Sequence, residues 1–302
     1  MEKNVWFEPL EKISEKVLWE ELLSLRATFG KGEVIALGTT VENRKIPCFR
    51  IGNGNKRILY VGGHHGAEWI TATVLLFFLR ELCAGIRVCN VSPEWILQAV
   101  SLTVLPLLNV DGAVLQSCEK ERKFDPFYEF HRRLNLGNED FSRWQANGRG
   151  VDLNHNYDYR FSEYKQAEAS FSIFGPGSAK FSGAHAESEP ETHALADLIR
   201  NECPTLILSL HTQGEEIFAP VPAGTEARGK KIALRASRLT GYRLTVPEGT
   251  AAYGGLCDWS ATKLGIPSLT LECGKGSNPL PPGEAFGIYQ RLRELLFVAT
   301  TF

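Results

Sequence analysis

Three short apolar runs in this sequence end in residues that could meet around a metal ion. The residues at these ends are His64-His65-Gly66-Ala67-Glu68, His211 and Glu272. Open α/β sheets form their sites just beyond the carboxyl ends of the strands. Two imidazoles and one carboxylate can bind zinc and leave a fourth position for water. The sequence therefore predicts a catalytic zinc site built from these ends.

The first of these segments offers two histidines for one metal position. His65 and Glu68 are three residues apart at the start of a helix, a spacing that can turn both side chains toward one point. His64 is four residues before Glu68 and satisfies this geometry nearly as well, so spacing leaves both histidines open. A single histidine at a strand end is more often a hydrogen-bonded structural residue. Three such ends in one chain favour a metal site.

Strand-like runs alternate with helical patterns along most of the chain, which predicts an α/β fold with a largely parallel or mixed sheet. We expect strands near residues 34–37, 47–51, 58–61, 99–105, 205–210 and 268–271, and helices near 67–82, 189–200, 230–239 and 285–298. Residues 1–30 are expected to form an N-terminal helical extension that ends at Gly30.

Residues 118–149 differ from the rest because they are charged, aromatic and aperiodic. A loop of this length inside a compact domain is more often functional than idle, so we expect a long active-site loop here. No internal repeat, low-complexity linker or composition break divides the chain. Residues 1–302 are therefore expected to form one catalytic domain.

Composition excludes several classes of protein. The chain has 302 residues, of which 43% are hydrophobic and 23% charged, and its formal net charge is −2. A nucleic-acid binder would usually be strongly basic. The sequence has no apolar stretch typical of a signal peptide or a membrane span. Its seven cysteines are scattered and never spaced as C-x-x-C, which favours reduced thiols and a cytoplasmic location. Nothing indicates an oligomeric state.

Several motifs resemble those of the zinc carboxypeptidase family, whose best-known member is pancreatic carboxypeptidase A. The H-x-x-E-W-I signature matches residues 65–70, and the G-V-D-x-N segment matches 150–154. The strands that carry the third zinc ligand and the catalytic glutamate resemble residues 208–211 and 269–272. A P-x-x-N-x-D-G turn matches 106–112. These matches occur in the family's order. The resemblance implies a single-domain α/β/α sandwich with a central mixed, mostly parallel twisted sheet.

The resemblance also implies a role for each matching residue. One zinc ion would be held by His65, Glu68 and His211, which favours His65 over His64. Asp152 would orient His65. Glu272 would act as general base toward a metal-activated water and then as general acid toward the leaving amine.

Other positions depart from the family pattern. The family binds the substrate's terminal carboxylate with an asparagine-arginine pair, but the matching residues here are Asn154 and His155. Imidazole does not reproduce the fork geometry and permanent charge of arginine. Gln145 stands where the family has an oxyanion-stabilising arginine, and Arg143 or Arg149 could substitute in space. Thr250 matches the tyrosine that covers the substrate in the family, and Tyr253 lies close to it in sequence. Cys257 matches the residue that points into the family's side-chain pocket. We expect these positions to bind substrate as well.

The run from Trp144 to Asn154 resembles the bacterial branch that cleaves γ-D-glutamyl–diamino acid bonds in cell-wall peptides. The expected function is thus a zinc metallopeptidase, either a carboxypeptidase or a muropeptide peptidase, whose partner is a small peptide rather than a nucleic acid or a membrane. Two alternatives remain open. One is an N-acyl amino acid deacylase of the aspartoacylase-like branch, and the other is an inactive relative that only binds peptides.

Overall fold

Eight strands form one sheet in the computed structural model, which describes residues 7–118, 122–220 and 226–302. The strands are β1 (Glu33–Thr39), β2 (Lys45–Ile51), β3 (Lys56–Gly62), β4 (Val100–Leu105), β5 (Leu206–His211), β6 (Glu216–Phe218), β7 (Arg243–Thr245) and β8 (Ser268–Glu272). Their order across the sheet is β1-β2-β4-β3-β5-β8-β6-β7.

The middle of the sheet is parallel and its margins are mixed. β4, β3, β5 and β8 run parallel to one another, whereas β2 is antiparallel to both β1 and β4, and β6 is antiparallel to β8. The parallel strands bring their carboxyl ends to one edge, where the last residues of β5 and β8 pair in register. The predicted mixed, mostly parallel α/β sheet is confirmed.

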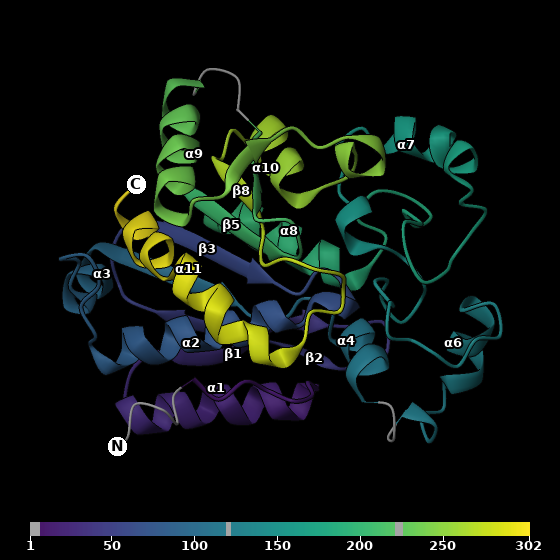
Figure 1. The fold of residues 1–302 in the computed structure, drawn as a ribbon, viewed down its shortest axis with the longest axis horizontal. Coiled ribbons are helices and arrows are strands. Elements are labelled where there is room, and N and C mark those ends of the chain that lie inside the picture. Colours follow the sequence, from purple (N-terminus) through teal and green to yellow (C-terminus); the bar gives the residue numbers. More distant parts are fainter. Residues whose placement is uncertain (1–6, 119–121, 221–225) are drawn as a thin grey trace.

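Helices connect and cover these strands (Figure 1). The larger ones are α1 (Glu15–Phe29), α2 (Ile70–Ala84), α4 (Val110–Ser117), α8 (Pro190–Glu202), α9 (Glu226–Thr240), α10 (Leu256–Leu264) and α11 (Ala285–Val298); shorter ones are α3 (Pro93–Ala99), α6 (Tyr128–Leu134) and α7 (Phe161–Ala167). Helix α11 packs along α2, and α10 packs on β5 and β8. Every residue of β5 is buried, so both faces of the sheet are covered at its centre.

Of the predicted N-terminal helical extension, residues 1–6 lie outside the described residues, and the α-helix α1 begins only at Glu15. The ends of α1 have local causes. The Ser14 hydroxyl accepts a hydrogen bond from the Val17 N–H, which satisfies one of the free donors of the first turn. Gly30 ends the helix in the left-handed conformation, with φ 63°.

The segment predicted as a long loop contains helix α6 and a small core of its own. Phe141 and Trp144 are buried there against Leu115 of α4. The end of the segment lies beside the turn after β3, where the Gly66 N–H donates a hydrogen bond to the Gln145 carbonyl at 2.9 Å.

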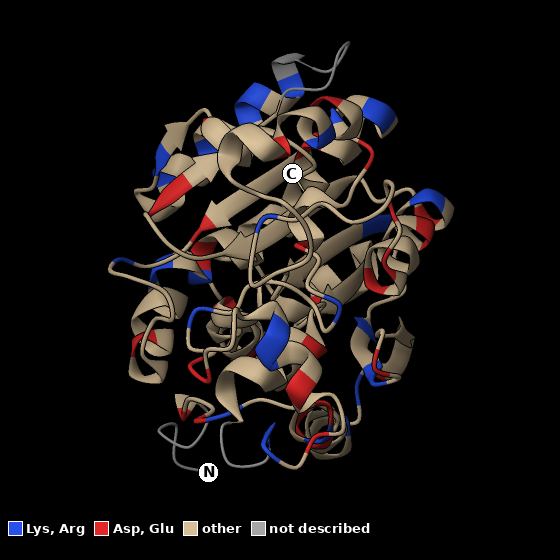
Figure 2. Cartoon of the chain, turned by 90° about the vertical axis from the view of Figure 1, so that its right-hand side faces the viewer, with Lys and Arg blue, Asp and Glu red and all other residues tan. Residues whose placement is uncertain are grey.

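Basic and acidic residues alternate along much of the described ribbon, as the colours of Figure 2 show. In the part of the chain that the structure describes, no helix has both the length and the apolar character needed to cross a bilayer.

Phe78 makes the core testable, because it lies between two other aromatic rings and is 0% exposed. Its centroid is 5.5 Å from that of Tyr60 and 5.1 Å from that of Phe297. We expect Phe78→Ala to lower the free energy of unfolding by about 3–5 kcal/mol, measured by denaturant titration. Phe124→Ala is the matched control, since Phe124 is 89% exposed and surface changes usually stay within about 0.5 kcal/mol. Equal effects of the two changes would contradict this description of the core.

Candidate metal centre

A sharp turn after β3 positions His65 and Glu68. Gly63 has φ +60°, and a Cβ at this position would lie 2.4 Å from the Leu107 side chain, so the turn requires glycine. His65 then caps a short 3-10 turn, Gly66–Glu68, which leads directly into α2. This placement turns the two side chains toward each other.

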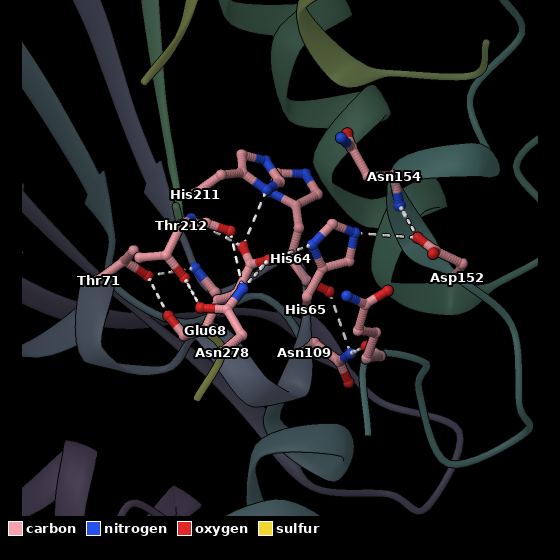
Figure 3. A network of polar contacts seen from close by, with 12 residues as sticks. His64, His65, Glu68, Thr71, Asn109, Asp152, Asn154, His211, Thr212 and Asn278 are labelled. Atoms are coloured by element: carbon pink, nitrogen blue, oxygen red, sulfur yellow. Dashed lines mark hydrogen bonds and ion pairs between the residues drawn. The ribbon is translucent and has the colours of Figure 1, made fainter. Parts of the chain in front are cut away.

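His65, Glu68 and His211 form a cluster at the carboxyl ends of β3 and β5 (Figure 3). Nδ1 of His65 lies 3.0 Å from Oε1 of Glu68, and Nδ1 of His211 lies 3.2 Å from Oε2 of the same carboxylate. One ligand atom from each residue lies within 4.8 Å of the others. Among the described residues, this is the one group of three or more such side chains close enough to hold an ion.

His64 lies next to this cluster but faces away from its carboxylate. Its Nε2 is 3.1 Å from the hydroxyl of Tyr157, and its Nδ1 is 3.5 Å from the hydroxyl of Ser209. The ring is fully buried and stacks on His211 with centroids 5.1 Å apart. These contacts make His64 a packing partner of the cluster.

The cluster fits a zinc ion by the chemistry of its donors. Zinc binds imidazole nitrogen and carboxylate oxygen at about 2.0–2.2 Å in tetrahedral geometry, which separates neighbouring ligand atoms by roughly 3.3 Å. The nitrogen–oxygen separations of 3.0 and 3.2 Å are close to that spacing. Glu68 and His211 are buried, and His65 is partly open toward a cavity. A site with three protein ligands and one open side is typical of catalytic rather than structural zinc.

Asp152 lies behind His65. Its Oδ1 is 3.1 Å from Nε2 of His65, and it also accepts a hydrogen bond from the Asn154 N–H at 3.1 Å. Its Oδ2 accepts one from the Lys180 N–H at 3.0 Å. A proton on Nε2 of His65, held by this carboxylate, leaves the Nδ1 lone pair free for a metal.

Two further residues hold Glu68, and neither is predicted from the sequence. The Asn278 amide donates to Oε1 of Glu68 at 3.2 Å and to the Thr212 carbonyl at 2.9 Å. The Thr212 N–H donates to Oε2 of Glu68 at 3.1 Å, and its hydroxyl donates to the Asn278 side chain at 2.7 Å. The three residues thus form a closed ring of hydrogen bonds (Figure 3). The one available signal is that Thr212 directly follows His211.

Glu272 is the last residue of β8 and pairs in register with His211 of β5. It is half-buried and lines the same cavity as His65. Burial and the negative charge of Glu68 raise the pKa of Glu272 to about 8. A cation bound at the cluster would oppose this shift. A carboxyl group whose pKa lies near neutrality can both accept and return a proton.

A cavity of about 220 Å³ opens from the cluster. Besides His65, Asp152 and Glu272, it is lined by Gln145, Asn154, His155, Lys180, Phe218, Thr250, Ala251, Tyr253, Gly255, Asp258 and Thr270. Most of the residues expected to bind substrate are therefore brought together. Arg149 and Cys257 are not among the lining residues: Arg149 lies 3.5 Å from Glu189, and Cys257 is buried.

His155 occupies the position at which the family has its carboxylate-binding arginine. Its ring forms part of the cavity wall. Its Nδ1 donates to the Tyr253 carbonyl at 3.0 Å, and the ring stacks on Tyr164 with centroids 4.5 Å apart. Burial lowers the pKa of His155 below its usual value. This imidazole is therefore neutral at pH 7 and is a poor substitute for arginine.

Comparisons with known proteins agree with this geometry. A family model described as zinc carboxypeptidase matches residues 30–289. The γ-D-glutamyl-L-diamino acid endopeptidase 1 of Lysinibacillus sphaericus is 30% identical over 264 residues, which make up 84% of this chain but 63% of that protein. The chain thus spans less than two thirds of this relative's length.

Two solved structures are similar in fold. Thrombin-activatable fibrinolysis inhibitor has a TM-score of 0.72 at 19% identity, covering 99% of this chain and 75% of that one. The murein-tripeptide amidase from Escherichia coli O157 has a TM-score of 0.53 at 20% identity, covering 90% of this chain and 95% of that one.

Proposed function

We propose that this chain, which belongs to the zinc carboxypeptidase family, hydrolyses the amide bond between a γ-D-glutamyl residue and a diamino acid in small cell-wall peptides. As a member of this family, the chain is a metallopeptidase that uses one zinc ion. The observation that carries the choice of substrate is the neutral, wall-forming His155 where a carboxypeptidase has its arginine. The similarity to a γ-D-glutamyl-L-diamino acid endopeptidase supports the same choice.

In this proposal, His65, Glu68 and His211 hold the zinc, and Asp152 orients His65. Zinc, when bound, supplies Lewis acidity that makes water more acidic and the scissile carbonyl more electrophilic. Glu272 accepts the proton of the attacking water and later gives it to the leaving amine. Gln145 lines the cavity and can donate its amide to the developing oxyanion, less strongly than an arginine would.

We further propose that residues 1–302 act as one catalytic domain, and that the predicted loop 118–149, of which residues 119–121 lie outside the described residues, contributes to the active-site rim through Gln145. The seven scattered cysteines favour a reducing compartment, so the substrate would be a recycled cytoplasmic muropeptide.

A substrate panel tests this function. Zinc-loaded protein would be offered γ-D-glutamyl–diaminopimelate peptides, ordinary C-terminal dipeptides and N-acyl amino acids. We expect kcat/KM for the first class to exceed the others by about 100-fold or more, a ratio that polar recognition in a buried site can supply. Preference for N-acyl amino acids would favour the deacylase alternative. Binding without turnover of any class would favour an inactive relative.

Asp152→Asn is expected to weaken zinc binding by about 10- to 100-fold, because an amide holds the His65 N–H less strongly than a carboxylate does. Zinc affinity would be measured by competition with a chelator of known affinity. Asp158→Asn is the matched control, because the Asp158 side chain is 57% exposed and pairs with Lys263 on the surface. Unchanged zinc affinity in Asp152→Asn would contradict the orienting role.

Asn278→Ala is expected to weaken zinc binding by about tenfold, because it removes a donor that holds Oε1 of Glu68. Ser277→Ala changes the neighbouring exposed residue and should leave the affinity unchanged. A lower melting temperature in Asn278→Ala with normal zinc affinity would mean that Asn278 only holds the loop.

A further inference from the structure

Among the described residues, one lysine lines the substrate cavity, and no described group pairs with its ammonium. Of the described residues that line it, Lys180 is the one lysine or arginine. Arg149 lies against Glu189 outside this lining. The positive charge available to a substrate in this part of the structure, apart from the metal, therefore belongs to Lys180.

The backbone of Lys180 is fixed from both sides. Its N–H donates to Oδ2 of Asp152 at 3.0 Å, and its carbonyl accepts from the Tyr164 hydroxyl at 2.7 Å. The same Asp152 carboxylate contacts His65. One acidic side chain therefore ties the backbone of Lys180 to a proposed zinc ligand, so the lysine side chain starts from a fixed point on the cavity wall.

The ammonium group itself is free to bind a ligand. Lys180 is exposed, and no described residue forms a hydrogen bond or ion pair with its side chain. Its charge contributes to the lowered pKa of His155, whose main cause is burial, so the ammonium acts on the same wall of the cavity.

Asn154 offers a second donor on this wall. Its side-chain oxygen accepts from the Leu256 N–H at 3.1 Å. The nitrogen of the same amide has no hydrogen-bond partner among the described residues. An ammonium and a primary amide together can bind a carboxylate, with the ammonium acting as a point charge rather than a fork.

We propose that Lys180, with Asn154, binds a free carboxylate of the leaving diamino acid. This inference rests on the proposed function and narrows it. The substrate class becomes peptides in which the diamino acid keeps an unblocked carboxylate, and extension of the peptide through that carboxylate would weaken binding.

The test compares two substrates that differ in one group. A γ-D-glutamyl–diamino acid peptide with a free carboxylate and its carboxamide would be assayed with the wild type, Lys180→Met and Lys180→Arg. We expect Lys180→Met to lower kcat/KM for the free acid by about 10- to 100-fold, mainly through KM, because a hydrogen bond to a charged group is lost. The carboxamide should change by less than about threefold, since it carries no charge for the ammonium to bind. Lys180→Arg should restore most of the preference for the acid.

Lys263→Met is the matched control, because it removes the same charge from an exposed position that pairs with Asp158. Zinc content should be normal in all variants, since the Lys180 contact with Asp152 is made by the backbone. Equal losses on acid and carboxamide, or no loss on the acid, would overturn the assignment.

Calorimetry on the zinc-loaded protein can measure binding of the free diamino acid and of its carboxamide without any turnover. This binding assay therefore tests the carboxylate site separately from the proposed hydrolytic function. If the wild type cleaves no γ-D-glutamyl amide, the proposed function fails, and a Lys180-dependent preference for the free acid in the binding assay would still support the carboxylate site. If neither ligand binds better to the wild type than to Lys180→Met, the carboxylate site is refuted whatever the enzyme cleaves.

Discussion

His65→Gln is expected to abolish stoichiometric zinc binding, whereas the same change at the neighbouring His64 should leave it intact. Nδ1 of His65 faces Glu68 at 3.0 Å, so glutamine removes a metal donor. Loss of a residue that only orients a metal ligand weakens binding by up to roughly 100-fold. We expect the loss of the ligand His65 itself to lower zinc affinity by more than that. Metal analysis after zinc reconstitution would measure this directly, and peptidase activity should be lost with the metal.

His64→Gln provides the control within the same segment. His64 contacts Tyr157 and Ser209 and stacks on His211, so its loss should destabilise the fold without removing a ligand. We expect zinc to raise the melting temperature of the wild type and of His64→Gln, but not that of His65→Gln, because a ligand stabilises only a protein that binds it. Loss of this zinc-dependent shift in His64→Gln alone would reverse the assignment of the two histidines.

The sequence predicts that the metal-binding and catalytic side chains meet at one edge of the sheet, because parallel strands bring their carboxyl ends together there. His211 and Glu272 end neighbouring parallel strands, and such strands finish at one edge. Spacing alone could not decide between His64 and His65. Both lie in the turn after β3, where Gly63 has a left-handed backbone. A Cβ at Gly63 would lie 2.4 Å from the Leu107 side chain, so this turn depends on a tertiary contact that no local pattern records.

The residues that support the cluster could not be predicted for a different reason. Asn278 is 210 residues from Glu68 in sequence, and it reaches Glu68 from a loop beyond β8. Lys180 lies in an irregular segment and reaches the site because its N–H is bonded to Asp152. Loops without hydrophobic periodicity give no register from which such contacts could be inferred. Long-range hydrogen bonds of this kind are visible only in three dimensions.

Glu272→Gln is expected to lower kcat by about 10²- to 10⁴-fold while zinc content stays normal. Glutamine keeps the size of the side chain but cannot accept the proton of the attacking water. Glu216→Gln is a close control, because Glu216 pairs with Glu272 across the sheet and affects its pKa, yet forms its own ion pair with Arg243. Its activity should remain within about threefold of the wild type, as expected for a group without a role in proton transfer.

The pH profile distinguishes a base from a merely structural carboxylate. Because the proton must be absent from Glu272 for it to act as a base, kcat/KM of the wild type should fall as pH decreases through its pKa. Burial raises this pKa to about 8, and bound zinc should lower it, so the fall is expected below pH 8. Residual activity of Glu272→Gln should lack this acid limb. If Glu272→Gln kept normal turnover with the limb unchanged, another group would be the base; if the wild type showed no turnover to lose, the chain would be a peptide-binding relative.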